Sequence, residues 1–307
     1  MFEVVIIGAG PAGLSAALIL GRSRRNVLVC DTGEHRNSAS HAMHGFLTRD
    51  GIAPMELLRL ARDQLRPYDT IELRSVKVVD AIHHPAHFEL TLADDTHITS
   101  RKLILATGVV DELPPIEGAE AFYGQGVFHC PYCDGWEHRD QPIAIYGAGK
   151  HGRKLALELR QWSHDLTLCT NGPAQLSSME RERLTRHNIQ IREERITRLE
   201  GNNGVLERIV FTNDQSLECR ALFFRGHEQQ RSDLPEKLGC TFSKKGAVRT
   251  GDYEATNVPG LYVVGDASRR VQFAIIAAAE GAAAAWAINT ELLKEDLASR
   301  YQEDKKE

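Results

Sequence analysis

The sequence predicts an α/β protein made of two three-layer nucleotide-binding domains, with the second domain inserted into the first. Two observations lead to this prediction. A strand–glycine–helix pattern occurs twice, at a constant offset of 139 positions from Gly8 to Gly147. Apolar strand-like segments also lie on both sides of the second copy, as expected when one domain interrupts another. The 307 residues, 42% of them hydrophobic, are sufficient for two domain cores.

The first copy begins with the apolar run Val4 to Ile7, which we expect to be a strand. A glycine-rich turn, a helical stretch to about Leu20 and a second strand from Asn26 to Cys30 follow. In such a Rossmann-like unit the glycines permit a tight turn, close approach of a pyrophosphate, and close packing of helix on strand. The predicted binding residues of this turn are Gly8, Gly10, Pro11, Ala12 and Gly13.

Asp31 follows the second strand of the first copy. Its carboxylate can accept hydrogen bonds from two ribose hydroxyls, which suits the adenosine ribose of FAD. The alternative interpretation is a solvated turn aspartate in front of Thr32 and Gly33.

The second copy comprises a strand from Ile143 to Tyr146, a glycine turn, a helix to about Trp162 and a strand from Leu166 to Cys169. Thr170 stands where the first copy has Asp31, and it neither repels nor attracts a 2′-phosphate. The sequence therefore favours NADPH without excluding NADH. The predicted nucleotide-binding residues here are Gly147, Gly149, Lys150, His151, Gly152 and Thr170.

Several segments outside the second copy are expected to complete the first domain. Ile71 to Val79 and Phe88 to Leu92 alternate as strands do, and Leu103 to Ala106 is an apolar strand that ends in Thr107-Gly108. Pro114 and Pro115 follow as a stiff connection. The predicted boundaries are residues 1–113 and 244–307 for a discontinuous FAD-binding domain, and 114–243 for an NAD(P)-binding domain.

The first domain is expected to resume with the strand Leu261 to Val264, which ends in Gly265-Asp266. Gly265 permits close approach of a ligand, and Asp266 can bind the hydroxyls of a ribityl chain. A helix beginning near Val271 would direct its positive end at the flavin. Gly-Asp is also an ordinary turn pair.

Cys130 and Cys133 are the only closely spaced pair among the six cysteines. Two cysteines separated by two residues can form and break a disulfide within one helical turn, and a helix N-terminus lowers the pKa of the leading thiol. Asp134 could move the accompanying proton, although Asp-Gly is also a simple turn. A zinc site would need two further ligands, and we expect no metal. The remaining cysteines are predicted to be structural: Cys30, Cys169, Cys219 and Cys240.

Composition excludes several function classes. A net charge of -5 and a pI near 6.2 give no reason to expect nucleic acid or an anionic membrane as a partner. The sequence starts without a leader-like pattern, so we expect a cytoplasmic protein. The alanine-rich stretch Phe273 to Ile288 is too short to span a bilayer and is predicted to be a buried helix. His83, His84 and His87 are expected in a solvated turn rather than a metal site.

Taken together, the motifs resemble those of the low-molecular-weight thioredoxin reductase family, along essentially the whole chain. The matching positions are Gly8 to Gly13, Ala106-Thr107-Gly108, Cys130 to Asp134, Gly147 to Gly152, and Gly265-Asp266 with Gln272. The resemblance implies bound FAD, with Thr107, Gly108 and Gln272 among its contacts. It also implies that Cys133 faces the flavin, Cys130 attacks the substrate disulfide and Asp134 is the acid-base residue. A homodimer and a large domain rotation are implied as well.

Two departures from this pattern leave the substrate and the nucleotide open. Pro131-Tyr132 lies between the cysteines, and Cys169-Thr170-Asn171-Gly172 replaces the usual basic segment. The first hypothesis is an NADPH-dependent reductase of thioredoxin or a similar protein. The second, also by resemblance, is a small-molecule dithiol oxidase of the gliotoxin and holomycin type that passes electrons to oxygen. The third is a flavin redox sensor that does not turn over.

Overall fold

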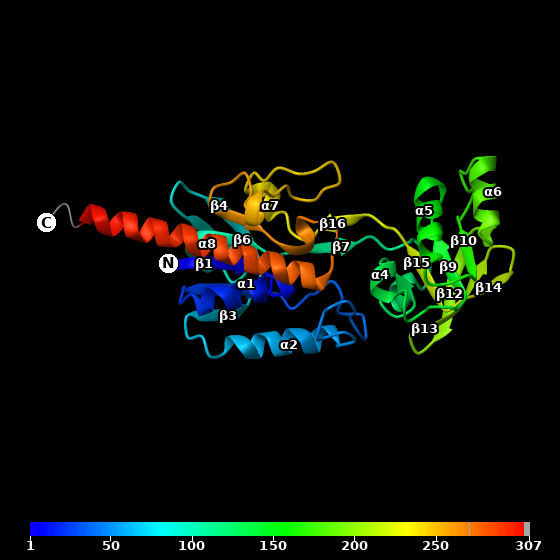
Figure 1. Cartoon of the computed structure of the whole chain (residues 1–307), viewed down its shortest axis with the longest axis horizontal. Helices are drawn as coiled ribbons and strands as arrows, with labels where there is room; N and C mark the ends of the chain where they lie inside the picture. The colour runs from blue at the N-terminus through cyan, green and yellow to red at the C-terminus, as the bar shows by residue number, and fades with distance from the viewer. Residues whose placement is uncertain (270, 304–307) are drawn as a thin grey trace.

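The computed structural model describes residues 1–269 and 271–303. Two α/β bodies lie side by side along the long axis of the molecule and are joined by a narrow two-stranded ribbon (Figure 1). The larger body contains both the N-terminal strand and the C-terminal helix, and the smaller body is formed by the middle of the chain.

The larger body is built on a seven-stranded sheet with the order β3-β2-β1-β6-β5-β4, in which β17 also pairs with β6. Five strands are parallel to their neighbours, and β5 and β4 continue the sheet antiparallel. The strands are β1 (Phe2–Ile7), β2 (Val27–Asp31), β3 (Ile71–Ser75), β4 (Val78–His83), β5 (Phe88–Leu92), β6 (His97–Leu105) and β17 (Leu261–Val263).

Both faces of this sheet are buried, so β1 is continuously apolar rather than alternating. Val4 and Ile6 pack against the helices α1 (Pro11–Arg22), α2 (Pro54–Leu65) and α8 (Ala274–Glu303). Val5 and Ile7 face the opposite side, together with β4, β5 and α7 (Leu234–Lys237). The result is a three-layer unit.

The smaller body contains a fully parallel five-stranded sheet with the order β11-β10-β9-β15-β8. Its helices α5 and α6 cover one face, and an antiparallel sheet of β12, β13 and β14 covers the other. The bounds are β8 (Val127–Phe128), β9 (Ile143–Tyr146), α5 (Gly149–Leu159), β10 (Leu166–Cys169), α6 (Ser178–Arg186), β11 (Ile189–Arg192), β12 (Ile196–Asn202), β13 (Val205–Phe211), β14 (Ser216–Glu218) and β15 (Ala221–Phe224).

The chain leaves the larger body along β7 (Val109–Asp111) and returns along β16 (Glu228–Gln230), and these two strands pair antiparallel. Leu234, Leu238 and Cys240 already pack in the core of the larger body, ahead of residue 244. Short helical turns complete the chain: α3 (Ala119–Phe122), α4 (Pro131–Asp134), η1 (Asp252–Glu254) and η2 (Gly265–Ala267).

The predicted fold class is confirmed, because two three-layer α/β units are present and the second lies between β6 and β17 of the first. Two boundaries differ from expectation. The segment Ile71 to Val79 is divided at Val76-Lys77, and the helix expected near Val271 begins at Ala274. Hydrophobic pattern alone does not locate such ends, which depend on backbone hydrogen bonds. No helix in the described part of the chain is long and apolar enough to cross a membrane.

Candidate active site at the carboxyl ends of the first sheet

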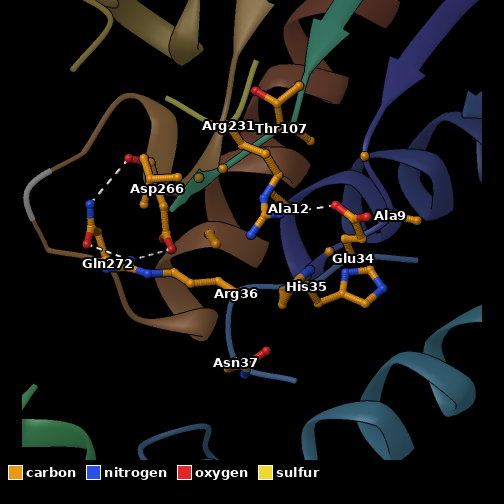
Figure 2. A pocket seen from close by; sticks show the side chains of 18 of the residues that line it. Ala9, Ala12, Glu34, His35, Arg36, Asn37, Thr107, Arg231, Asp266 and Gln272 are labelled. Carbon is orange, nitrogen blue, oxygen red and sulfur yellow. Dashed lines mark hydrogen bonds and ion pairs between the residues drawn. The ribbon is translucent and has the colours of Figure 1, made fainter. Parts of the chain in front are cut away.

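A cavity of about 950 Å³ lies over the first glycine turn, where β1, β2, β6 and β17 end (Figure 2). This volume lies within the range of cofactor-binding clefts. The structure brings most of the predicted residues of the first domain together in its wall. They are Gly8, Gly10, Pro11, Ala12, Asp31, Thr107, Gly108, Gly265, Asp266 and Gln272, joined by Cys133 and Asp134 from the smaller body.

The glycine turn has the close packing and the open space that a pyrophosphate site requires. A Cβ on Gly8 would lie 2.4 Å from the carbonyl oxygen of Ala106, and one on Gly13 would lie 1.9 Å from that of Gly8. A Cβ on Gly10 would meet no atom of the described residues within 4 Å, its two chain neighbours aside. Gly8 and Gly13 therefore hold the turn against β6 and α1, whereas Gly10 keeps the backbone accessible to a ligand.

The polar groups of the wall also fit a dinucleotide. Asp31 Oδ1 accepts a hydrogen bond from the Ala9 amide at 3.0 Å, and Oδ2 accepts one from Arg62 at 2.6 Å. Each carboxylate oxygen keeps a further lone pair for a ribose hydroxyl. Thr107 Oγ1 is buried in the cavity wall and has no hydrogen-bond partner among the residues that the structure describes, which is the state expected of a group that binds a ligand.

Arg36 is a residue of this site that the sequence analysis did not identify. Its guanidinium donates to Asp111 at 2.6 and 2.7 Å, to Asp266 at 2.8 Å and to Gln272 at 2.6 Å. Figure 2 shows Arg36 extending toward Asp266 and Gln272, with Arg231 entering the cavity from the segment after β16. No local pattern marks Arg36, because its partners lie 75 to 236 positions away in the sequence.

A buried carboxylate holds the Gly265-Asp266 turn from behind. Glu280, in the second turn of α8, accepts a hydrogen bond from the Gly265 amide at 2.8 Å and one from Arg269 at 2.6 Å. Arg269 in turn binds Glu254. Burial raises the pKa of Glu280, while these two donors favour its charged form. The charge that interrupts the alanine-rich helix therefore has a structural role at the site.

Cys130 and Cys133 form a disulfide across the first turn of α4. Pro131 occupies the first helical position, and Cys130 is the N-cap residue, whose sulfur accepts a hydrogen bond from the Cys133 amide. Cys133 and the following Asp134 line the cavity over the first glycine turn. The dithiol pair of the smaller body is thus adjacent to the nucleotide cavity of the larger one.

Asp134 is largely surrounded by protein, and its pKa is shifted upward. Burial raises the pKa of Asp134 to about 7, and repulsion from Glu137 adds to the shift. A carboxyl group with such a pKa can both donate and accept a proton near neutral pH.

His129, beside Cys130, is attached to a polar chain that starts at Arg36. Asp111 Oδ2 accepts a hydrogen bond from the Tyr123 hydroxyl at 2.7 Å, and the Tyr123 oxygen lies 3.1 Å from His129 Nδ1. The charge of the Arg36 guanidinium, with the hydrogen bonds that Arg36 and Tyr123 donate, keeps the pKa of Asp111 below its usual value despite burial. Tyr123 has a single hydroxyl proton, and this proton is already donated in the hydrogen bond to the charged Asp111. Nδ1 of His129 must therefore be the donor to the Tyr123 oxygen. Neutral His129 is then an acceptor at Nε2.

The second glycine turn differs from the first. Gly147 and Gly152 pack against each other, as Gly8 and Gly13 do. However, the Gly149 amide donates to the Ala174 carbonyl at 2.8 Å. Thr170 is buried, and its hydroxyl donates to the carbonyl of Gly172 at 2.6 Å. The residues predicted here, with Lys150 and His151 at the start of α5, lie in the smaller body, apart from the large cavity.

The free cysteines are buried, as expected for structural residues. Burial raises the pKa of Cys30 and Cys240 to about 11 and that of Cys169 to about 12. These thiols therefore stay protonated at neutral pH and do not compete with the Cys130–Cys133 pair.

Comparison with known proteins agrees with this geometry. Residues 2–281 match the family model described as pyridine nucleotide-disulphide oxidoreductase. A probable thioredoxin reductase of Arthroderma benhamiae is 33% identical over an aligned length of 302 residues, and the match covers 87% of this chain and 74% of the relative. A crystal structure of putative thioredoxin reductase TrxB from Bacillus anthracis superimposes with a TM-score of 0.91 at 33% identity, covering 96% and 100% of the two chains. The crystal structure of HlmI superimposes with a TM-score of 0.95 at 34% identity, covering 99% and 96%.

Proposed function

This chain belongs to the pyridine nucleotide-disulphide oxidoreductase family, and on that premise we propose that it transfers electrons from NADPH, through FAD, to a disulfide substrate by way of Cys130–Cys133. Within the family it is a thioredoxin reductase-like enzyme, a group whose cofactors are FAD and NAD(P)H. One observation carries the proposal: Cys133 and Asp134 line the same cavity as the first glycine turn.

The residues of the first domain fit FAD. The turn at Gly8 to Gly13 would receive the pyrophosphate, and Asp31 would accept the ribose hydroxyls. Thr107 and Gly108, with Gly265, Asp266 and Gln272, form the remaining wall. Bound FAD supplies a group that takes up and releases an electron pair, which side chains alone do not provide.

The disulfide is the second redox group of the proposal. Two electrons and two protons convert Cys130–Cys133 to a dithiol. The Cys130 thiolate then attacks a substrate disulfide, one substrate sulfur leaves as a thiol, and Cys133 displaces the other as the protein disulfide re-forms. Cys133 lies on the cavity side, consistent with the roles proposed for the two cysteines.

Two groups are available to move the protons. Asp134, with a pKa of about 7, gives a proton to a leaving thiolate and recovers it from solvent. His129 Nε2, unprotonated because Nδ1 donates to Tyr123, is a second acceptor next to Cys130. Asp134 is the stronger candidate because it lies directly beside Cys133 in the cavity wall.

The test is anaerobic titration of the purified protein with NADPH, and separately with NADH, while flavin absorbance is followed in wild type and Cys133→Ser. We expect the wild type to take up about two electron pairs, one for the flavin and one for the disulfide, and the variant about one. A flavin that is not bleached, or identical uptake by both proteins, would contradict the proposed route.

We propose a thioredoxin-like protein as the substrate. Tyr132 and Trp136, on and just after α4, are 65% and 64% exposed, so the segment that carries the disulfide also presents aromatic side chains at the surface. Such side chains are common at protein interfaces. The proposal includes a homodimer and a cytoplasmic location, where buried thiols remain reduced. Reduction of thioredoxin by the NADPH-supplied enzyme tests the substrate, and light scattering tests the dimer.

The state of the second glycine turn favours a second candidate, a small-molecule dithiol oxidase that passes electrons to oxygen. There the Gly149 amide already donates a hydrogen bond to the Ala174 carbonyl, and the Thr170 hydroxyl already donates one to the Gly172 carbonyl. Neither donor is available to a nucleotide in this state. Oxygen consumption with a small dithiol, in the absence of NADPH, distinguishes this candidate from the reductase. Oxidation of the dithiol faster than reduction of thioredoxin would favour the oxidase.

A further inference from the structure

The segment 171–177 lies across the second glycine turn, and we refer to it as the cover segment. Its Ala174 carbonyl accepts the Gly149 amide at 2.8 Å, and Ala174 is fully buried. A Cβ on Gly149 would lie between 3.6 and 3.8 Å from atoms of Gln175. The chain itself therefore occupies the space directly over Gly149.

The first turn provides an internal comparison, because Gly10 and Gly149 are equivalent in the repeat. Gly10 is open, because a Cβ there would have no atom of the described chain within 4 Å beyond its sequence neighbours, and its φ is -74°. Gly149 has a φ of +56°, a left-handed conformation that glycine adopts readily, and its N–H faces the cover segment. The same sequence motif is accessible in one domain and closed in the other.

A dinucleotide requires the position that the cover segment occupies. The second glycine of such a turn is the point at which the backbone approaches the pyrophosphate, and the amides at the helix start donate to its oxygens. Gly149 cannot donate to Ala174 and to a phosphate with full strength at once. Binding of the nucleotide at this turn therefore requires displacement of the cover segment.

Glu193, the residue after β11, holds the cover segment in place. Its carboxylate accepts a hydrogen bond from the Ala174 amide at 2.7 Å and pairs with Arg181 at 2.6 Å. The Arg181 and Glu193 side chains remain 40% and 43% exposed, so their pairing is screened by water and weak. Gln175 has a φ of +53°, which is unfavourable for a residue with a side chain. These features describe a closed state that can open.

We infer that the cover segment competes with NAD(P)H for the second glycine turn, and that Glu193 sets the nucleotide affinity by holding the segment closed. The inference rests on the proposed function, because it assumes that the second turn is the nicotinamide nucleotide site. It adds that affinity for NAD(P)H depends on residues that stabilise the closed state, Glu193 above all, as well as on residues that bind the nucleotide.

The test uses the FAD-loaded protein and compares wild type, Glu193→Ala and the matched control Glu194→Ala. Glu194 follows Glu193 and pairs with Arg192 rather than with the cover segment. Binding is measured by equilibrium dialysis of NADP⁺, which cannot reduce the flavin. We expect about tenfold tighter binding to Glu193→Ala, the effect of losing one charge-assisted hydrogen bond from the closed state, and no change for Glu194→Ala.

Hydrogen exchange provides a second readout that is independent of turnover. Saturating NADP⁺ should accelerate exchange in peptides covering 171–177 of the wild type. Equal affinities in all three proteins, or slower exchange of the cover segment with NADP⁺, would overturn the inference. Absence of binding in all three would overturn it too. Reduction of the flavin by dithiothreitol would then show whether the dithiol chemistry survives.

Discussion

Asp134 illustrates how burial, more than a charged neighbour, adjusts the pKa of a single residue for proton transfer. Its carboxyl lies in the cavity wall, where loss of hydration destabilises the charged form and raises its pKa to about 7. The same group in water would be fully ionised at neutral pH. Its chemistry depends on the second body remaining against the cavity.

Replacement of Asp134 by Asn should therefore lower the rate of disulfide reduction and also remove the dependence of that rate on pH near 7. We expect disulfide reduction to slow by about 100-fold, the lower range for loss of a general acid-base group. The bend near pH 7 in the wild-type rate profile should disappear. Stopped-flow measurement between pH 5.5 and 8.5 checks this, with the exposed Asp140→Asn as control. A bend that persists in Asp134→Asn would assign the titration to another group.

The same substitution makes a prediction about stability. Because the folded state raises the carboxyl pKa, it binds more protons than the unfolded state between about pH 4 and 7. The contribution of Asp134 is thus most favourable at low pH and is lost as the pH rises through 7. The difference in melting temperature between Asp134→Asn and wild type should therefore be more favourable to the variant at pH 8 than at pH 5. Differential scanning calorimetry at the two pH values measures this difference.

Glu280 is a second residue whose effect can be isolated. Glu280→Gln removes the charge that binds Arg269 and weakens the bond to the Gly265 amide. We expect the dissociation constant of FAD to rise about tenfold, because hydrogen bonds to charged groups contribute about 1.5–3 kcal/mol. Flavin fluorescence on dilution reports the release. Glu291→Gln, also on α8 but bonded to Lys102 and Tyr262, should leave FAD affinity unchanged.

At the scale of elements, the parts predictable from sequence are those set by local pattern. The two strand–turn–helix units are correct because apolar runs and glycines specify them within about 25 residues. The Arg36 contacts were not predictable, since they join residues 75 to 236 positions apart. The path of the cover segment was not predictable either, because it is an irregular loop without a periodic pattern. Local sequence pattern could not show that Cys133 lines the cavity of the larger body, because this position depends on how the two bodies are oriented.

The contact between α1 and α8 gives a prediction at this scale. A Cβ on Gly281 would lie 2.0 Å from the carbonyl oxygen of Ala12, so the two helices touch through backbone. Gly281→Ala must separate them, and overpacking of this kind typically costs about 1–3 kcal/mol. We expect a lower melting temperature and weaker FAD binding, because Ala12 lines the cavity. Gly251→Ala, whose Cβ would meet only Ala255 O at 3.9 Å, is the control.

For the whole molecule, a continuous set of polar contacts links the two bodies. Arg36 belongs to the larger body, Asp111 to the ribbon strand β7, and Tyr123 and His129 to the smaller body. The contacts favour the arrangement in which Cys133 lines the cavity. Arg36 is therefore expected to influence the relative orientation of the bodies as well as the cavity wall.

Arg36→Ala should loosen this arrangement. It leaves Asp111 buried and charged without its main partner, which costs about 3 kcal/mol of stability. The double variant Arg36→Ala/Asp111→Asn removes that charge but does not restore the link. We expect it to recover stability while small-angle scattering still shows a broader distribution of shapes. A wild-type scattering profile in both variants would contradict the role in orientation, and the exposed Arg59→Ala is the control.

The insertion of one body into the other has a consequence for synthesis on the ribosome. Strands β1 to β6 emerge before the smaller body, yet β17 and α8, which complete their sheet and cover its face, are made after it. The smaller body is continuous in sequence and is fully synthesised before them. Because domains fold as units once their residues are available, we expect the smaller body to reach its native state first. Strands β1 to β6, within residues 2–105, must wait with their apolar side chains exposed until β17 and α8 have been made.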